Sequence, residues 1–416
     1  MMYRVWYSTE SFADFIIDKT SLSNKEVVKK KLAESDTKAP NDFYKIPDHI
    51  RKILYLDCAD IIVEKDNNPI ICIEETKEAG TGHDVTQRFS RIMAALENKV
   101  PVIYIQPEGV IVRRNNRRYG WDKINPFLFS VMDRATNLYN MPALFYYFPS
   151  DIAEYRTNPV NAPNFSKKGI RYDVNSIRYA GCPDSTDIST INMLAAIDEI
   201  INLVEQYGVV DYKSHLMGNR IIQEQRAFMN EEFVLKSKRR NPRSMSPASK
   251  AVTVPTSYLL NYLSQHEDDE YSIGELLRQR ENTVIYQADS TFRGDPYAGN
   301  LSAIDCFMCR TGSTYEDRDC NLVLAFGEVV VDHESETIRL LSRNHVSIND
   351  MFREVQSSSR HNLLVKNHSE LRNDQIPRYF MQVRYGSVYS KNKHIRVYSH
   401  LADAILFEDG SLWRDA

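Results

Sequence analysis

Residues 57–106 constrain the fold of this chain more than any other stretch. Two apolar segments rich in β-branched residues, Cys58 to Glu64 and Ile70 to Lys77, flank Asp66-Asn67-Asn68-Pro69, which has the composition of a tight turn. A glycine-containing loop, a segment at 84–97 and an apolar segment at 100–104 follow. The segment at 84–97 carries an apolar stripe at helical spacing, formed by Phe89, Ile92, Met93 and Leu96. The stretch therefore predicts a hairpin, a helix and a third strand of an α/β domain.

Charged residues lie where the two predicted hairpin strands end. Because successive side chains of a strand alternate faces, Glu75 and Lys77 point one way while Glu74 and Thr76 point the other. We expect Asp60 on the partner strand to face Glu75 across the ladder, with roughly 5 Å between their β-carbons. Two carboxylates beside an ammonium suit metal-assisted phosphodiester hydrolysis, because Mg²⁺ takes one or two carboxylates and keeps several waters. The lysine would orient or deprotonate the attacking water.

This pattern resembles the PD-(D/E)XK nuclease superfamily and, within it, type II restriction endonucleases. The resemblance covers about a quarter of the chain and is carried by Asp60, Glu75-Thr76-Lys77 and Gln87-Arg88, with the helix and strand that follow. Ala59 stands where the family motif has proline. The alternative is that Glu75 and Lys77 form a solvated pair at a strand end, with Asp60 a charge at the strand edge.

The resemblance implies a restriction-endonuclease-like core, a mixed central sheet flanked by helices, that cleaves double-stranded DNA with Mg²⁺, for which Mn²⁺ can substitute. Asp60 and Glu75 would hold the metal, with Glu74 as the register alternative, while Lys77 and Gln87 would serve catalysis. A restriction enzyme also implies a cognate DNA methyltransferase, and cutting two strands with one site per subunit favours a homodimer. Such folds usually carry a supporting glutamate on an N-terminal helix, expected here at 22–36 with Glu26 or Glu34.

Several basic groups are candidates for DNA contact. Arg88 and Arg91 lie at the start of the helix predicted at 84–97, where the helix dipole also favours a phosphate. An Asn-Asn turn in the hairpin predicted at 110–121 is flanked by four arginines, and a loop-like run at 164–178 adds two lysines. The six residues are Arg113, Arg114, Arg117, Arg118, Lys167 and Lys168. For each group the alternative is an ordinary solvated surface.

The length of 416 residues allows two domains. We expect a nuclease domain at 1–235, a basic linker or mobile arm at 236–250, and a β-rich α+β domain at 251–416 for target recognition or dimer contact. The net charge is −4, so any nucleic-acid surface must be local. The six cysteines show no disulfide-framework spacing, and no segment has about 18 consecutive apolar residues. The sequence thus predicts a cytoplasmic protein that makes no membrane contact.

The second half has cysteines whose role the sequence leaves open. Cys306, Cys309 and Cys320 are three potential zinc ligands rather than four, and buried thiols are the simpler explanation. Two other functions also stay open. One is a nuclease of the same core used in repair, on branched DNA or on RNA. The other is a non-catalytic DNA-binding protein built on a decayed nuclease core.

Overall fold

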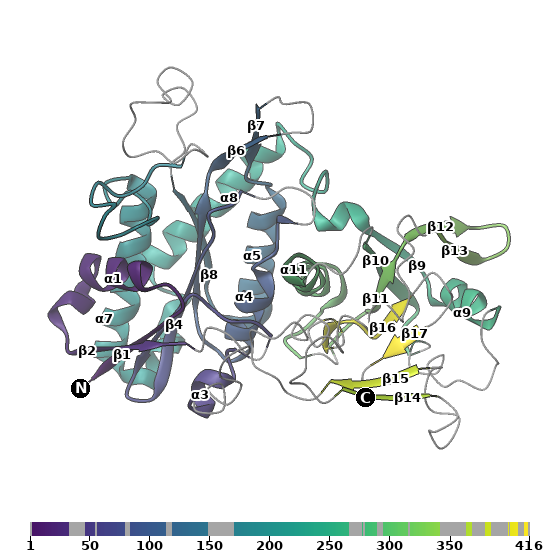
Figure 1. Cartoon of the computed structure of the whole chain (residues 1–416), viewed down its shortest axis with the longest axis horizontal. Coiled ribbons are helices and arrows are strands. Elements are labelled where there is room, and N and C mark those ends of the chain that lie inside the picture. The colour runs from purple at the N-terminus through teal and green to yellow at the C-terminus, as the bar shows by residue number, and fades with distance from the viewer. Residues whose placement is uncertain are drawn as a thin grey trace. The chain divides into compact units, whose positions relative to one another are not determined.

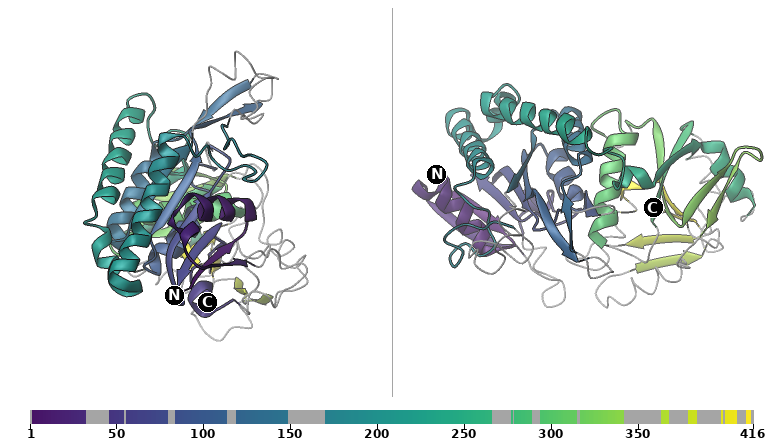
Figure 2. Two further views of the ribbon diagram at one scale, coloured as in Figure 1. Left: turned by 90° about the vertical axis from the view of Figure 1, so that its left-hand side faces the viewer. Right: turned by 90° about the horizontal axis from the view of Figure 1, so that it is seen from above.

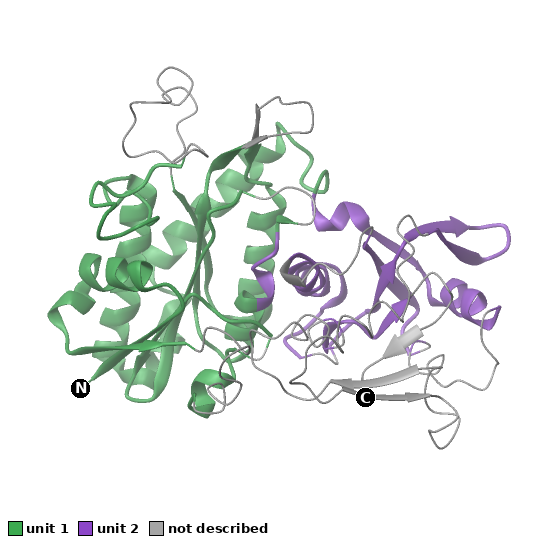
Figure 3. Ribbon diagram, viewed as in Figure 1, with its two compact units in different colours: residues 1–34, 44–85, 91–245 green, residues 35–43, 86–90, 246–416 purple. Residues whose placement is uncertain are grey.

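The computed structural model describes residues 2–32, 46–54, 56–79, 84–113, 119–148, 170–265, 277, 279–288, 294–314, 317–341, 363–367, 379–383, 398, 400–406 and 412–414. The chain divides into two compact units (Figure 3). Unit 1 comprises 1–34, 44–85 and 91–245, and unit 2 comprises 35–43, 86–90 and 246–416. The division near 245 falls within the basic stretch at 236–250.

Unit 1 is an α/β unit built on a mixed six-stranded sheet with the strand order β2-β1-β3-β4-β5-β8 (Figure 1). β1 pairs in parallel with β2 and antiparallel with β3, β3 and β4 are antiparallel, and β4, β5 and β8 are parallel. The bounds are β1 Tyr3–Tyr7, β2 Val27–Lys31, β3 Ile61–Lys65, β4 Asn68–Glu75, β5 Val102–Pro107 and β8 Ala143–Phe148. The three parallel strands are almost wholly buried, as their continuous apolar sequences require.

The hairpin of β3 and β4 forms as the sequence predicts. Asp66 and Asn67 both adopt positive φ, 49° and 62°, which is the backbone of the two-residue turn that suits the twist of paired strands. A bulge between Val63 and Glu64 shifts the register near that turn. At the other end Ile61 pairs with Ile73, so continuing the ladder by one residue sets Asp60 opposite Glu74. The expectation that Asp60 lies directly opposite Glu75 was therefore wrong by one residue.

Helices cover both faces of this sheet (Figure 1), and Figure 2 shows α7 and α8 side by side. α7 packs on β4 and β8 through its buried residues, and α8 contacts α5, α7 and β8. A positive φ at Gly208 kinks α7. The bounds are α1 Glu10–Lys19, α3 Asp48–Arg51, α4 Phe89–Glu97, α5 Phe127–Tyr139, α7 Ile188–Leu216 and α8 Arg220–Ser237, with a 3₁₀ turn, η1, at Ser21–Asn24.

The N-terminal segment differs from the sequence-based expectation. The charged helix expected at 22–36 is absent, because residues 21–24 form η1 and Val27–Lys31 form the edge strand β2. The helix in this region is α1, which buries Phe12, Phe15 and Ile16. Glu26 therefore precedes a strand, and Glu34 lies outside the described residues. The basic hairpin is present as β6 (Gly109–Arg113) and β7 (Tyr119–Lys123).

Unit 2 is built on a seven-stranded sheet with the order β14-β15-β17-β16-β11-β10-β9. Its apolar core includes Leu259, Ile285, Val323 and Leu406. The strands are β9 Ala251–Pro255, β10 Asn282–Ala288, β11 Cys320–Phe326, β14 Leu363–Asn367, β15 Tyr379–Val383, β16 Ala404–Leu406 and β17 Leu412–Arg414, with a separate hairpin of β12 Glu328–Asp332 and β13 Thr337–Leu341. The helices are α9 Thr256–Ser264 and α11 Gly294–Ile304, followed by a π-helical turn at Asp305–Cys309.

The two ends of the basic stretch at 236–250 belong to helical elements, while the turns at 238–245 between them are mostly exposed. α8 continues to Ser237, and a 3₁₀ turn at Pro247–Lys250 packs on β9, β10 and α11. Ser246, Pro247 and Ala248 are buried, so this half of the stretch belongs to the core of unit 2. Among the described residues, no helix is long and apolar enough to cross a membrane.

Candidate active site

The hairpin brings the carboxylate of Asp60 to the end of β4. Asp60 lies just before β3, and its Oδ2 accepts the backbone N–H of Glu75 at 2.9 Å. Its Oδ1 accepts a hydrogen bond from the Ser8 hydroxyl at 3.0 Å. Ser8 follows β1, the neighbouring strand, so three consecutive strands of the sheet fix this carboxylate. The register sets Asp60 opposite Glu74, but its carboxylate binds the Glu75 backbone and lies near enough to Glu75 to raise the pKa of that side chain.

Glu74 leaves β4 on the opposite face and belongs to a buried ion cluster. Its Oε1 pairs with the guanidinium of Arg91 from α4, and its Oε2 accepts the backbone N–H of Asp60 at 3.1 Å. The Nε of Arg91 pairs with Asp57 at 2.9 Å, and its Nη1 lies 3.7 Å from Asp60. Both Glu74 oxygens are therefore engaged, one of them with a guanidinium, whereas Glu75 Oε1 has no hydrogen-bond partner among the described residues, and this contrast favours Glu75 as the ligand.

Arg91 was expected to contact DNA, but the structure gives its guanidinium a different environment. The side chain is 10% exposed and lies against the carboxylates of Asp57 and Glu74. Because removing one partner from a buried ion pair leaves the other charge uncompensated, Arg91 is needed to keep these acids ionised in the interior. Its placement indicates that it holds the hairpin end in shape.

Glu75 is a partly buried residue with one inaccessible, unsatisfied carboxylate oxygen. Its Oε1 is inaccessible to solvent and has no hydrogen-bond partner among the described residues. Burial raises the pKa of Glu75 to about 8, an increase to which the Asp60 carboxylate adds and which the Lys77 ammonium opposes. Buried polar groups in native proteins nearly always have a partner, so an orphan carboxylate oxygen indicates a missing cation or proton.

Lys77 extends from the end of β4 into contact with a glycine of a distant loop. A β-carbon at Gly181 would lie 2.9 Å from Lys77 Cε and closer still to Nζ. Only glycine at this position therefore leaves room for the ammonium group where it lies. Gly181 also has φ +78°, a conformation that other L-residues rarely adopt. The end of the Lys77 side chain therefore lies against the backbone of this loop.

Local hydrogen bonds hold this loop, residues 170–187. Buried Asp173 accepts bonds from the backbone of Asn175 and from the backbone and hydroxyl of Ser185. Ser11 of α1 donates its hydroxyl to the Ala180 carbonyl, and its own carbonyl accepts from Cys182 Sγ at 3.5 Å. Burial, with a contribution from the nearby Glu75 carboxylate, raises the pKa of the Cys182 thiol well above its usual range. Cys182 is thus a neutral buried group.

The donor set fits a small hard cation. Mg²⁺ uses one or two protein carboxylates and completes its shell with water. Asp60 and Glu75 supply two, and a divalent charge would remove the cost of ionising Glu75 in the interior. Among the described residues there is no group of three or more His, Cys, Asp or Glu side chains that could hold a metal, which excludes a fully protein-ligated site within that part of the chain.

The other candidate residues lie in different places. Gln87 and Arg88 form a turn before α4 rather than its first helical residues. Gln87 is 8% exposed, and its carbonyl carbon would lie 2.7 Å from a β-carbon at Gly299 of α11, so its backbone packs closely inside unit 2. Arg113 is in β6. Outside the described residues lie Arg114, Arg117, Arg118, Lys167 and Lys168.

The cysteines of the second half show no metal site. Cys306 and Cys309 are buried in the π-helical turn, and Cys320 at the start of β11 is partly exposed. None of the three forms a disulfide. Burial raises the pKa of Cys309, so this thiol stays protonated.

Sequence reasoning missed three groups around the site: Ser8, Asp57 and Gly181. Ser8 and Asp57 were visible only as polar residues next to strands, and nothing local shows that they meet Asp60 and Arg91. The Gly181-Cys182-Pro183 sequence has turn character, which could have flagged a fixed loop but not its contact with Lys77. Comparison with family models, curated proteins and solved structures found no match to this chain.

Proposed function

We propose that this chain is a Mg²⁺-dependent, sequence-specific endodeoxyribonuclease of the restriction type that hydrolyses phosphodiester bonds in double-stranded DNA. The observation that carries the proposal is the buried Glu75 oxygen without a partner, next to the Asp60 carboxylate and on the same side of β4 as Lys77. An antiparallel hairpin followed by a helix and a parallel strand is also the order of elements that the PD-(D/E)XK resemblance implies. Mn²⁺ would substitute for Mg²⁺.

Asp60 and Glu75 would hold the metal, which supplies a water of lowered pKa and neutralises charge on the phosphate. The Asp60 carboxylate is oriented for this by Ser8 and the Glu75 backbone. Lys77 places an ammonium group beside Glu75, where it orients the attacking water and stabilises the negative charge that develops on the phosphate oxygens. The loop at Gly181 keeps that ammonium in place.

The wider context is part of the same proposal. One site per chain acting on two DNA strands favours a homodimer, and protection of host DNA would require a cognate methyltransferase. Such an enzyme would work in the cytoplasm. Unit 2 would contribute to target recognition or to dimer contact.

Lys77→Ala tests the proposal, with Lys30→Ala on the exposed strand β2 as the matched control. With Mg²⁺ and a duplex that the parent cuts, we expect Lys77→Ala to bind as the parent does and to cleave at least about a hundredfold more slowly. Lys30→Ala should cleave normally. Equal cleavage by Lys77→Ala and the parent would refute this assignment. Cleavage that depends on DNA branching rather than sequence would favour the repair-type alternative.

A further inference from the structure

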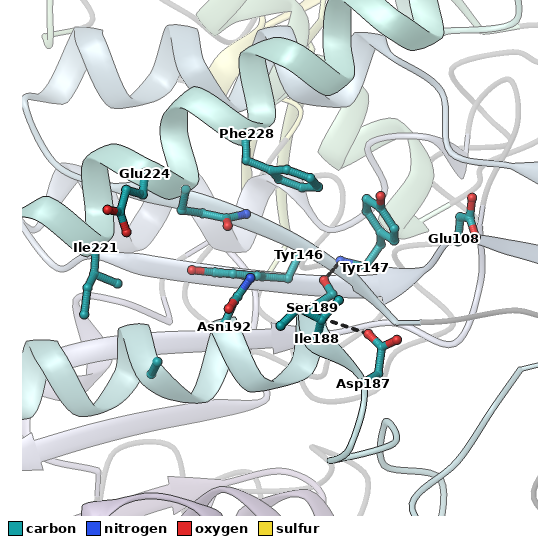
Figure 4. A pocket seen from close by; sticks show the side chains of 12 residues that line it. Glu108, Tyr146, Tyr147, Asp187, Ile188, Ser189, Asn192, Ile221, Glu224 and Phe228 are labelled. Carbon is teal, nitrogen blue, oxygen red and sulfur yellow. Dashed lines mark hydrogen bonds between the residues drawn. The ribbon is translucent and has the colours of Figure 1, made fainter.

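A cavity of about 460 Å³ lies between α7, α8 and β8 of unit 1, away from the residues assigned to catalysis (Figure 4). α7 lines it partly with small side chains, Ser189 and Ala195, so the two helices leave the space above β8 unfilled. The volume lies in the range typical of small-molecule sites, roughly 300–1,000 Å³.

The floor of the cavity contains a buried polar group that lacks a partner. Tyr146 is 1% exposed, and its hydroxyl has no hydrogen-bond partner among the described residues. Figure 4 shows this hydroxyl between the two helices, directed to the end where Ile221 and Glu224 lie. Burial raises the pKa of Tyr146, so the group is a neutral hydroxyl.

The charged groups that line the cavity are all acidic. Glu224 lies at one end and is paired with Arg220 at 2.7 Å. Glu108 and Asp187 lie at the other end (Figure 4), and no basic side chain pairs with either among the described residues. Asp187 uses one oxygen to cap α7 through the Ser189 N–H at 2.9 Å. The negative potential that results favours a cation and repels phosphate or carboxylate groups.

An ammonium group of the chain itself lies over an aromatic ring at this end of the cavity. The Lys236 ammonium lies 5.2 Å from the ring centroid of Tyr147, a cavity-lining residue, and 2.8 Å from Glu232. The pKa of Tyr147 is raised by burial and by the carboxylates of Glu232, Glu108 and Asp187. Exposed aromatic and aliphatic surface is adjacent, with Phe228 36% and Ile188 68% exposed.

We propose that this cavity is a binding site for an organic cation with an apolar body. Its ammonium or guanidinium group would contact Asp187 and Glu108, and its apolar body would pack on Tyr146 and Phe228. The inference is independent of the proposed nuclease activity, because it uses none of the residues of that site.

The test uses three probes of matched size and shape: phenethylammonium, the neutral 2-phenylethanol and the anion phenylacetate. Their binding to the full-length protein is measured by calorimetry at neutral pH. We expect the cation to bind about tenfold or more tightly than the alcohol, because hydrogen bonds to charged groups are the stronger ones, and the anion not to bind. Equal affinity of the three probes, or no binding of the cation at millimolar concentration, would overturn the proposal.

Variants locate the site. Asp187→Asn keeps the helix cap, since asparagine caps as well as aspartate, but removes the charge. We expect it to weaken phenethylammonium binding about tenfold and to leave the alcohol unaffected. Ala195→Trp should fill the cavity and abolish binding, whereas Asn202→Trp, exposed on the same helix outside the lining, should bind as the parent does. Normal cation binding by both Asp187→Asn and Ala195→Trp would place the cation elsewhere and refute the assignment.

Discussion

Gly181→Ala tests two roles of this glycine: it adopts a backbone conformation that other residues rarely take, and it leaves room for the Lys77 side chain. The first has a cost that follows from conformation, because an L-residue held at φ +78° loses about 1–2 kcal/mol of stability. Losing the second displaces the Lys77 side chain. The new β-carbon would lie 2.9 Å from Lys77 Cε and closer to Nζ, so the lysine must move. Since its end is flexible, the stability loss stays modest while the ammonium leaves its place beside Glu75.

Gly208→Ala is the matched control. Gly208 also has a positive φ, +82°, and an added β-carbon there would meet no atom within 4 Å. We expect both variants to lose about 1–2 kcal/mol in urea unfolding. Only Gly181→Ala should lose activity, by about a hundredfold, because a displacement of about 1 Å at a reacting group can cost that much.

The assay is single-turnover cleavage of a short duplex at saturating Mg²⁺, run beside urea unfolding of the same preparations. Single-turnover conditions exclude product release from the measured rate. Gly181→Ala and Gly208→Ala cleaving at the same rate would refute the reasoning, because the contact between Gly181 and Lys77 would then have no part in the reaction.

Three further outcomes are expected. Glu75 has a folded-state pKa of about 8 against an ordinary 4.5, so the stability of the protein falls as pH rises between these values. Glu75→Gln should remove that fall and stabilise the metal-free protein at pH 8 by on the order of 3 kcal/mol. Urea unfolding at pH 5 and pH 8 measures the difference. Mg²⁺ should raise the melting temperature of the parent at pH 8 more than that of Glu75→Gln; equal shifts would place the ion elsewhere. Arg91→Met should destabilise by about 3 kcal/mol in chemical unfolding, because it removes a cation that pairs with the buried carboxylates of Asp57 and Glu74. A loss below about 1 kcal/mol would contradict the buried-cluster account.

The parts of the fold that sequence predicted are those fixed by local signals. The hairpin is specified by β-branched runs and by the turn at Asp66 and Asn67, both of which adopt positive φ. The helix α4 follows from its apolar stripe, although it begins at Phe89 rather than Asp84 because the preceding residues form a turn. Periodicity within a dozen residues was sufficient for these elements.

The failure at residues 22–36 has a non-local cause. Val27–Lys31 looks like part of a charged helix, but its backbone pairs in parallel with β1. The Lys29 ammonium lies 2.8 Å from both Glu10 and Asp14 of α1, so charges that suggested a solvated helix are neutralised across the fold. Tertiary pairing therefore overrode local propensity.

The candidate site was predictable in its residues and unpredictable in its details. Asp60, Glu75 and Lys77 could be singled out because they lie at or next to strand ends: Asp60 just before β3, Glu75 at the end of β4 and Lys77 two residues beyond it. The register at Asp60 depends on the turn and on the bulge between Val63 and Glu64, which no sequence signal marks. The contact of Gly181 with Lys77 joins residues more than a hundred positions apart, and spacing along the chain carries no information about it.

Incubation of the purified protein with phage DNA, with Mg²⁺ and with a chelator, tests the central claim most directly. The account predicts discrete fragments in Mg²⁺ and intact DNA in the chelator. Unbroken DNA in both, over a range of substrates and Mg²⁺ or Mn²⁺ concentrations, would contradict it, and so would fragments that persist in the chelator.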